Sequence, residues 1–139
     1  MSSDGFVHRL RVRFGECDPQ GVVFNANYLL YFDVAFMELW RERLGGYAAM
    51  IERGVDVMLV QSNVGYRRPA KADDEIDVRL RVARVGTTSM ALGADVERDG
   101  ETLVEAELHY VFVDARSLAK TEIPADIRAA LSALSTRVK

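Results

Sequence analysis

Hydrophobic and polar residues alternate along several segments with the two-residue period of a β-strand that has one buried face. The first segment places its inward-facing residues at every second position: Phe6, His8, Leu10, Val12 and Phe14. The later segments of this kind are 76–82, 90–96 and 104–112. A further strand is predicted over 55–68, where Pro69 stops it because proline cannot donate to a strand ladder. The pattern therefore predicts five strands.

The segment from Tyr28 to Trp40 follows a different rule, because it is apolar on nearly every side of a helix. We predict a long helix from about residue 26 to residue 44, with Asn25 or Asn27 as its N-cap and two glycines after it as the stop. A helix of this composition must be covered on most sides. It is therefore expected to form the centre of the fold.

Shorter signals complete the chain. Residues 47–53 form a short amphipathic piece, and Asp99-Gly100 predicts a tight hairpin whose two central residues have positive φ. Pro124 opens a last helix with a single apolar stripe at Ile127, Leu131 and Leu134. Segregation of the strands after one helix predicts an α+β fold, a five-stranded antiparallel sheet wrapped around one long central helix. One sheet does not easily enclose a helix, so we expect a second subunit to cover the remaining side.

Composition narrows the classes of protein. The 139 residues, 49% of them hydrophobic, fit a single domain over 1–139. A net charge of −3 gives no global field that would attract nucleic acid. The apolar run of the central helix is interrupted by Asp33 and Glu38 and is too short to span a membrane. A single cysteine, Cys17, and the lack of a targeting signal at either end predict a cytoplasmic protein.

The candidate chemistry lies in the polar turn that precedes the long helix. Asp18 sits in a Pro/Gly turn, and an aspartate before proline is often only a turn cap. A helix N-terminus, however, leaves backbone amides unpaired and partly positive. A carboxylate beside such amides could attack a carbonyl, or deprotonate water, while the amides stabilise the oxyanion. The residues alone therefore allow Asp18 to be either a turn cap or a catalytic carboxylate.

Residues 14–28, FGECDPQGVVFNANY, together with Arg68-Pro69-Ala70, resemble hotdog-fold acyl-CoA thioesterases of the 4-hydroxybenzoyl-CoA thioesterase and YbgC-like family. The resemblance implies the hotdog fold, dimers that often pair into tetramers, and sites at the subunit interface. It implies that Asp18 is the nucleophile or general base and that the backbone amide of Asn25 binds the thioester oxygen. Some relatives have a histidine at position 25, so an asparagine there keeps only the backbone donor. The implied reaction is hydrolysis of a small or medium acyl-CoA, with no metal or organic cofactor.

A basic patch follows the second predicted strand. Its arginines suit the phosphates of CoA, although a solvated strand end explains them equally well. The residues expected to contact the substrate are Gly21, Tyr28, Arg67, Arg68, Lys71, Arg84 and Thr88.

Several alternatives remain open at this point. A second lineage of hotdog thioesterases uses a carboxylate of the central helix, for which Asp33 and Glu38 are candidates, although pairing with arginines is the simpler role for both. Cys17 has no histidine in its motif, which favours a small buried thiol over a nucleophile. A dehydratase would need a histidine near the helix start, and residues 18–44 contain none. A non-catalytic module that binds acyl-CoA or an acyl carrier is the alternative from another class of protein.

Overall fold

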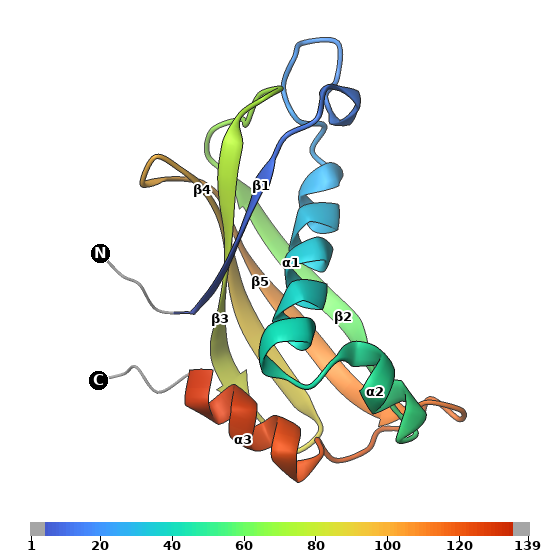
Figure 1. The fold of residues 1–139 in the computed structure, drawn as a ribbon. Helices are drawn as coiled ribbons and strands as arrows, with labels where there is room; N and C mark the ends of the chain where they lie inside the picture. The colour runs from blue at the N-terminus through green and yellow to red at the C-terminus, as the bar shows by residue number, and fades with distance from the viewer. Residues whose placement is uncertain (1–4, 135–139) are drawn as a thin grey trace.

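The structure is a computed structural model that describes residues 5–134. The terminal segments, where the sequence predicts no targeting signal, lie outside the described residues. Figure 1 shows a curved sheet with one long helix against it. The elements, in chain order, are β1 (Phe6–Arg11), the short 3₁₀ helix η1 (Phe14–Glu16), α1 (Asn27–Arg43), α2 (Tyr47–Glu52), β2 (Val55–Tyr66), β3 (Glu75–Val85), β4 (Ser89–Arg98), β5 (Glu101–Asp114) and α3 (Ala125–Leu134).

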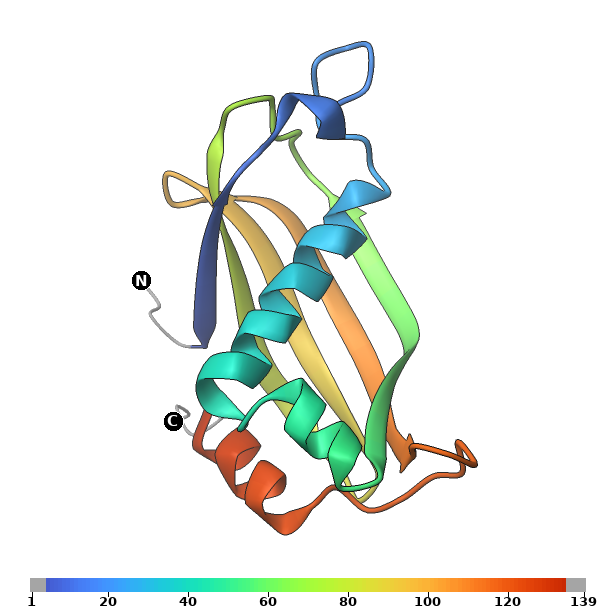
Figure 2. The ribbon, with the colours of Figure 1, turned by 45° about the vertical axis from the view of Figure 1, so that its right-hand side comes forward.

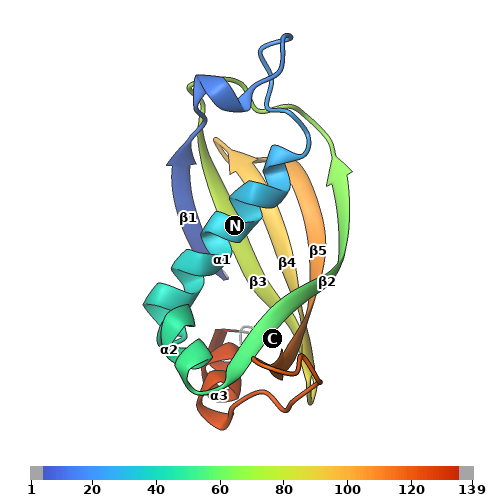
Figure 3. The ribbon, with the colours of Figure 1, turned by 90° about the vertical axis from the view of Figure 1, so that its right-hand side faces the viewer.

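The five strands form one antiparallel sheet in the order β1-β3-β4-β5-β2. β1 and β2 are therefore its two edges, as Figure 3 shows. The hairpin between β4 and β5 turns at Asp99 and Gly100, whose φ angles of 52° and 82° confirm the predicted turn. The predicted α+β architecture, a five-stranded antiparallel sheet around a long helix, is confirmed.

The core lies between α1 and the concave face of the sheet. Helix α1 crosses that face diagonally (Figure 2), and its 17 residues make it roughly 26 Å long. Trp40 has no exposed surface and packs edge-on against Phe36, with ring centroids 6.0 Å apart. The last helix adds Ile127 and Leu131 to the same core, as its predicted stripe required.

The sheet covers one side of α1 and leaves the other side open, as expected for a single sheet that does not enclose a helix. Leu30 is 49% exposed, Val34 is exposed one turn further along the same side, and Leu29 is exposed on the flank that faces β2. The physical reason is that an open sheet curves over only one side of a helix. The apolar residues on the other side are left without a cover from residues 5–134.

The first strand is shorter than predicted. β1 ends at Arg11, and the chain then turns through η1. Phe14, expected on the buried face, is instead 84% exposed, because the period of two ends where the strand ends. Val12 keeps its predicted buried position, and its N–H donates to the carbonyl of Asp74 at 2.8 Å.

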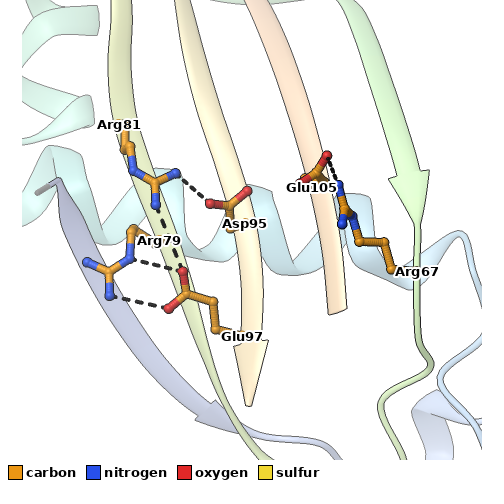
Figure 4. Close-up of polar contacts among 6 residues, drawn as sticks. All are labelled: Arg67, Arg79, Arg81, Asp95, Glu97 and Glu105. Atoms are coloured by element: carbon orange, nitrogen blue, oxygen red, sulfur yellow. Dashed lines mark hydrogen bonds and ion pairs between the residues drawn. The ribbon is translucent and has the colours of Figure 1, made fainter. Parts of the chain in front are cut away.

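The outer face of the sheet, away from α1, carries a network of ion pairs (Figure 4). Arg79 on β3 pairs with Glu97 on β4 at 3.2 Å, and Arg81 pairs with Asp95 at 2.5 Å. Only 14% of the Arg79 side chain and 16% of the Glu97 side chain are exposed, so this pair is largely shielded from water. The predicted polar parity of β3 and β4 is therefore correct.

Candidate functional site

The polar turn that carries Asp18 projects beyond the N-terminus of α1, at the end of the molecule opposite α2 and α3 (Figure 1). Two β-bridges close this turn on itself and onto the segment after β2: Cys17 with Val23, and Val22 with Lys71. The N–H of Val23 also donates to the carbonyl of Ala70 at 2.8 Å. Segments far apart in the sequence thus meet beside the start of the helix.

The Asp18 carboxylate accepts the N–H of Gln20 through Oδ1 at 2.8 Å. The Asp18 backbone closes the same turn, since its N–H donates to Val22 and its carbonyl accepts from Gly21. Gly21 has a φ of 82°, a conformation that a side chain would strain. The cap role of Asp18 is therefore present, and it occupies only one carboxylate oxygen. The other oxygen has no hydrogen-bond partner among residues 5–134.

Neither asparagine caps α1 in the predicted way. The N-cap position is Ala26, with no side-chain cap. The Asn27 side chain instead donates to the carbonyl of Glu16 at 2.8 Å, because the turn folds back beside the helix. In the part of the chain that the structure describes, the backbone amides of Asn25 and Ala26 have no acceptor. Two helix N-terminal donors are therefore available to a bound group.

Asp18 and Asn25 border one cleft of about 410 Å³. It is lined by Asp18, Val22, Val23, Asn25, Tyr28, Tyr66, Arg67, Arg68 and Pro69. The hydroxyl of Tyr28 has a structural partner: it accepts the N–H of Ala70 at 3.0 Å. Burial raises the pKa of Tyr28, so this side chain remains a neutral wall of the cleft.

The basic patch joins the same cleft, but its arginines already have partners. Arg67 reaches across the sheet to Glu105 at 2.9 Å (Figure 4), and Arg68 pairs with Glu101 at 2.5 Å. All four side chains are largely exposed, so water screens these pairs and an anionic ligand can compete for the arginines. The Lys71 side chain is exposed near this patch.

Arg84 and Thr88 lie at the far end of the molecule. Arg84 is nine residues along β3 from Glu75, which separates it from the cleft by roughly 30 Å of strand. Its guanidinium contacts the Ser89 hydroxyl at 3.3 Å. The single chain therefore does not bring these two residues to Asp18, and their contact with substrate stays a prediction.

The alternative catalytic residues have other surroundings. Burial, followed by the charges of Asp18 and Glu16, raises the pKa of Cys17 and disfavours the thiolate. Glu38 pairs with Arg41 at 2.5 Å, as expected for a structural carboxylate. Asp33 borders a separate pocket of about 270 Å³ between α1 and β2.

Residues 5–134 contain no group of three or more His, Cys, Asp or Glu side chains arranged to hold a metal ion. None of the helices in this part of the chain is long and apolar enough to cross a membrane.

Sequence reasoning missed one residue of this region, Glu16. Its carboxylate accepts hydrogen bonds from the Tyr31 hydroxyl and from the backbone N–H of Arg13, both at 2.8 Å. A glutamate in a loop has no local signal for a partner 15 positions away. The only hint was its place two residues before Asp18.

Comparison with known proteins places the chain in a family. Residues 12–131 match the family model of the thioesterase-like superfamily. The chain belongs to this superfamily. The acyl-CoA thioester hydrolase YbgC of Escherichia coli O6:H1 is 26% identical over 91% of this chain and 96% of its own. The 4-hydroxybenzoyl-CoA thioesterase of Pseudomonas sp. is 28% identical over 84% of this chain and 89% of its own.

A solved structure of a hypothetical protein from Thermus thermophilus aligns with a TM-score of 0.84. It is 32% identical over 93% of this chain and 98% of its own. The predicted resemblance, the hotdog fold and the assignment to the thioester hydrolases are thereby confirmed.

Proposed function

We propose that this thioesterase hydrolyses a small or medium acyl-CoA to the free acid and CoA, with Asp18 as the catalytic carboxylate. The observation that supports this most strongly is the cleft that Asp18 shares with Asn25, directly before α1, where the backbone amides of Asn25 and Ala26 lack acceptors among residues 5–134. The two related proteins named above also act on CoA thioesters. Substrate class and site geometry thus support the same reaction.

In the proposed reaction, the thioester carbonyl oxygen points at the amide of Asn25 and the neighbouring amide of Ala26. Asp18 attacks the carbonyl carbon, or removes a proton from the water that attacks it. Negative charge then develops on the oxygen, where the amides and the positive end of the helix dipole stabilise it. The C–S bond breaks and CoA leaves as the thiolate. On the nucleophilic route, water then hydrolyses the acyl-aspartyl anhydride.

The basic patch supplies the proposed contacts with the CoA phosphates. Arg67 and Arg68 border the cleft and can exchange their exposed glutamate partners for phosphate oxygens. Lys71 lies beside them as a further cation, Tyr28 forms part of the cleft wall, and Gly21 shapes the turn that carries Asp18. Arg84 and Thr88 can contribute only from a neighbouring subunit.

The deciding experiment compares Asp18→Asn with the wild type on a panel of short-chain, medium-chain and aromatic acyl-CoAs. Loss of the catalytic carboxylate is expected to lower kcat/KM by about 10²- to 10⁴-fold. Asp114→Asn is a matched control, because the Asp114 carboxylate, like that of Asp18, accepts backbone N–H groups within a turn, at the opposite end of the molecule. An unimpaired Asp18→Asn enzyme would refute the mechanism. Binding of acyl-CoA with no turnover in the wild type would favour the non-catalytic module.

We also propose a homodimer in which β2 edges pair. The two sheet edges differ: β1 presents Arg9 and Arg11, whereas β2 exposes apolar side chains at Met58, Leu59 and Val60. Val60, at the β-bulge of this edge, is 59% exposed. The apolar side of α1 left open by the sheet would be covered by the same partner. Such dimers could pair further into a tetramer.

Light scattering after size-exclusion chromatography tests this assembly. The wild type is expected to elute with the mass of two or four chains, and Val60→Lys to shift it toward one. Val7→Lys, on the opposite edge, is the control and should leave the mass unchanged. A wild-type mass of one chain at micromolar concentration would refute the dimer.

A further inference from the structure

We propose that Glu16 is a positioning residue that holds the Asp18 turn against the start of α1 through its bond with Tyr31. This inference rests on the proposed role of Asp18 and adds the device that fixes its place. Glu16 ends η1, two residues before Asp18, and Tyr31 lies on the second turn of the helix.

The Glu16 carboxylate bonds both to the chain entering the turn and to the helix. Oε1 accepts the Tyr31 O–H and the backbone N–H of Arg13, each at 2.8 Å. Oε2 accepts Nε–H of Arg13, also at 2.8 Å. The carboxylate therefore bridges the end of the first strand segment and α1.

The backbone carbonyl of Glu16 extends the same connection. It accepts the N–H of Phe24 at 3.0 Å and the side-chain amide of Asn27 at 2.8 Å. Phe24 is on the returning arm of the turn, and Asn27 is the first residue of α1. One residue thus contacts both arms of the turn and two successive turns of the helix.

These bonds form in a largely dry place. Only 13% of the Glu16 side chain is exposed, and Tyr31 is buried. Burial alone would raise the pKa of Glu16, but hydrogen bonds from Arg13 and Tyr31 outweigh it and hold the pKa below its ordinary value. Burial and the bond to Glu16 raise the pKa of Tyr31. The contact is therefore a phenol donating to a charged carboxylate, which is stronger than a neutral hydrogen bond.

Asp18 itself makes no such link. Its hydrogen bonds, to Gln20, Gly21 and Val22, all lie inside the turn. They fix the shape of the turn and leave its distance from the helix amides to other contacts. Misplacement of a reacting group by about 1 Å can cost 10²-fold in rate. The Glu16–Tyr31 bond fixes that distance, together with the bonds of the Glu16 carbonyl to Phe24 and Asn27.

Tyr31→Phe removes only the hydroxyl and tests the link most cleanly. We expect kcat for an acyl-CoA to fall about tenfold while KM stays within about twofold. Glu16→Gln is expected to lower kcat at least as much, because the amide NH2 that replaces Oε2 cannot accept from Arg13 Nε and the neutral carbonyl oxygen accepts more weakly from Tyr31. Tyr47→Phe is the matched control: Tyr47 also donates to a carboxylate, Asp56, but on α2 at the other end of α1.

A double-substitution experiment separates positioning from general stability. If Glu16 and Tyr31 act through Asp18, Tyr31→Phe causes no further loss of kcat in the Asp18→Asn background. An equal loss in both backgrounds, or an equal loss in Tyr47→Phe, would overturn the inference. An unchanged kcat in Tyr31→Phe, beside an impaired Asp18→Asn, would overturn it and leave the proposed function intact. An unimpaired Asp18→Asn would overturn both.

Discussion

At its N-terminal end, α1 is tied to the chain by polar contacts, whereas at its C-terminal end it is packed by aromatic rings. The first end has the bonds of Asn27 and Tyr31 to Glu16 and of Tyr28 to Ala70. The second end has Trp40, surrounded by the rings of Phe36, Tyr47 and Phe112 at centroid distances of 6.0–6.5 Å.

This difference separates two tasks. Hydrogen bonds depend on direction and distance, so they can hold a turn and a helix end in one relative position. Ring packing depends mainly on buried area and contributes most to the free energy of unfolding. The end with unpaired amides is therefore positioned by polar bonds, while the opposite end supplies stability. Substitutions at the two ends should affect different measurements.

The largest effect is expected at the aromatic end. Trp40→Ala should lower the free energy of unfolding by about 3–5 kcal/mol, because it leaves a cavity among packed rings. Urea denaturation measures this, and kcat per folded molecule should stay within about twofold. Glu42→Ala, exposed on the same helix, is the control and should change stability by less than about 0.5 kcal/mol. A large loss of kcat in folded Trp40→Ala would contradict the separation.

The next effect belongs to the cleft at the polar end. Arg68→Ala should raise KM for an acyl-CoA about tenfold, since a charge-assisted bond to phosphate is lost. With an N-acetylcysteamine thioester, which has no phosphates, KM should not change. Arg116→Ala, an exposed arginine beyond β5, is the control. Equal KM changes for both thioesters would show that Arg68 does not contact phosphate.

A smaller effect should appear in acid. Burial raises the pKa of Asp74, but bonds from the Lys71 N–H and from Arg98 lower it below its ordinary value of 3.8. Because the pKa of Asp74 is lower in the folded protein than in the unfolded chain, its contribution to stability is complete above about pH 4. That contribution is lost as the pH falls through the pKa of Asp74 in the folded protein. Urea midpoints between pH 6 and pH 3 should therefore fall less steeply in Asp74→Asn than in the wild type.

Asp126, paired with Arg53 at the aromatic end, provides the comparison for that experiment. The Arg53 bond lowers the pKa of Asp126 as well, but 64% of its side chain is exposed and solvent screens the pair. Asp126→Asn should therefore reduce the fall of the urea midpoint between pH 6 and pH 3 less than Asp74→Asn does. The reverse order would contradict the idea that polar bonds matter more at the N-terminal end of α1.

The smallest effect is expected at Asn25. Its exposed side chain has no hydrogen bond among the described residues, and only its backbone amide faces the cleft in the proposed mechanism. Asn25→Ala should keep kcat within about twofold and leave the urea midpoint unchanged. A tenfold loss of kcat would mean that the side chain, rather than the amide, contacts the substrate.

The sequence by itself determined the elements and the residue expected to do the chemistry. Alternation along β3 and β4, the apolar run of α1 and the Asp99-Gly100 turn are local patterns, so they predict structure without knowledge of what lies nearby. The motif around Asp18 identified the superfamily for the same reason. The one local prediction that was wrong is the end of β1. Phe14 continues the two-residue period of the strand in the sequence, although the chain has already begun to turn there.

Only the tertiary structure decided which partners these residues have. Glu16 meets Tyr31, Arg67 meets Glu105, and Arg84 lies far from Asp18, because strand order and the diagonal path of α1 set distances that sequence spacing does not encode. The exposure of Leu30 was decided in the same way, by how far the sheet curves. Local patterns depend on neighbours along the chain, whereas the shape of a site depends on segments that meet only after folding.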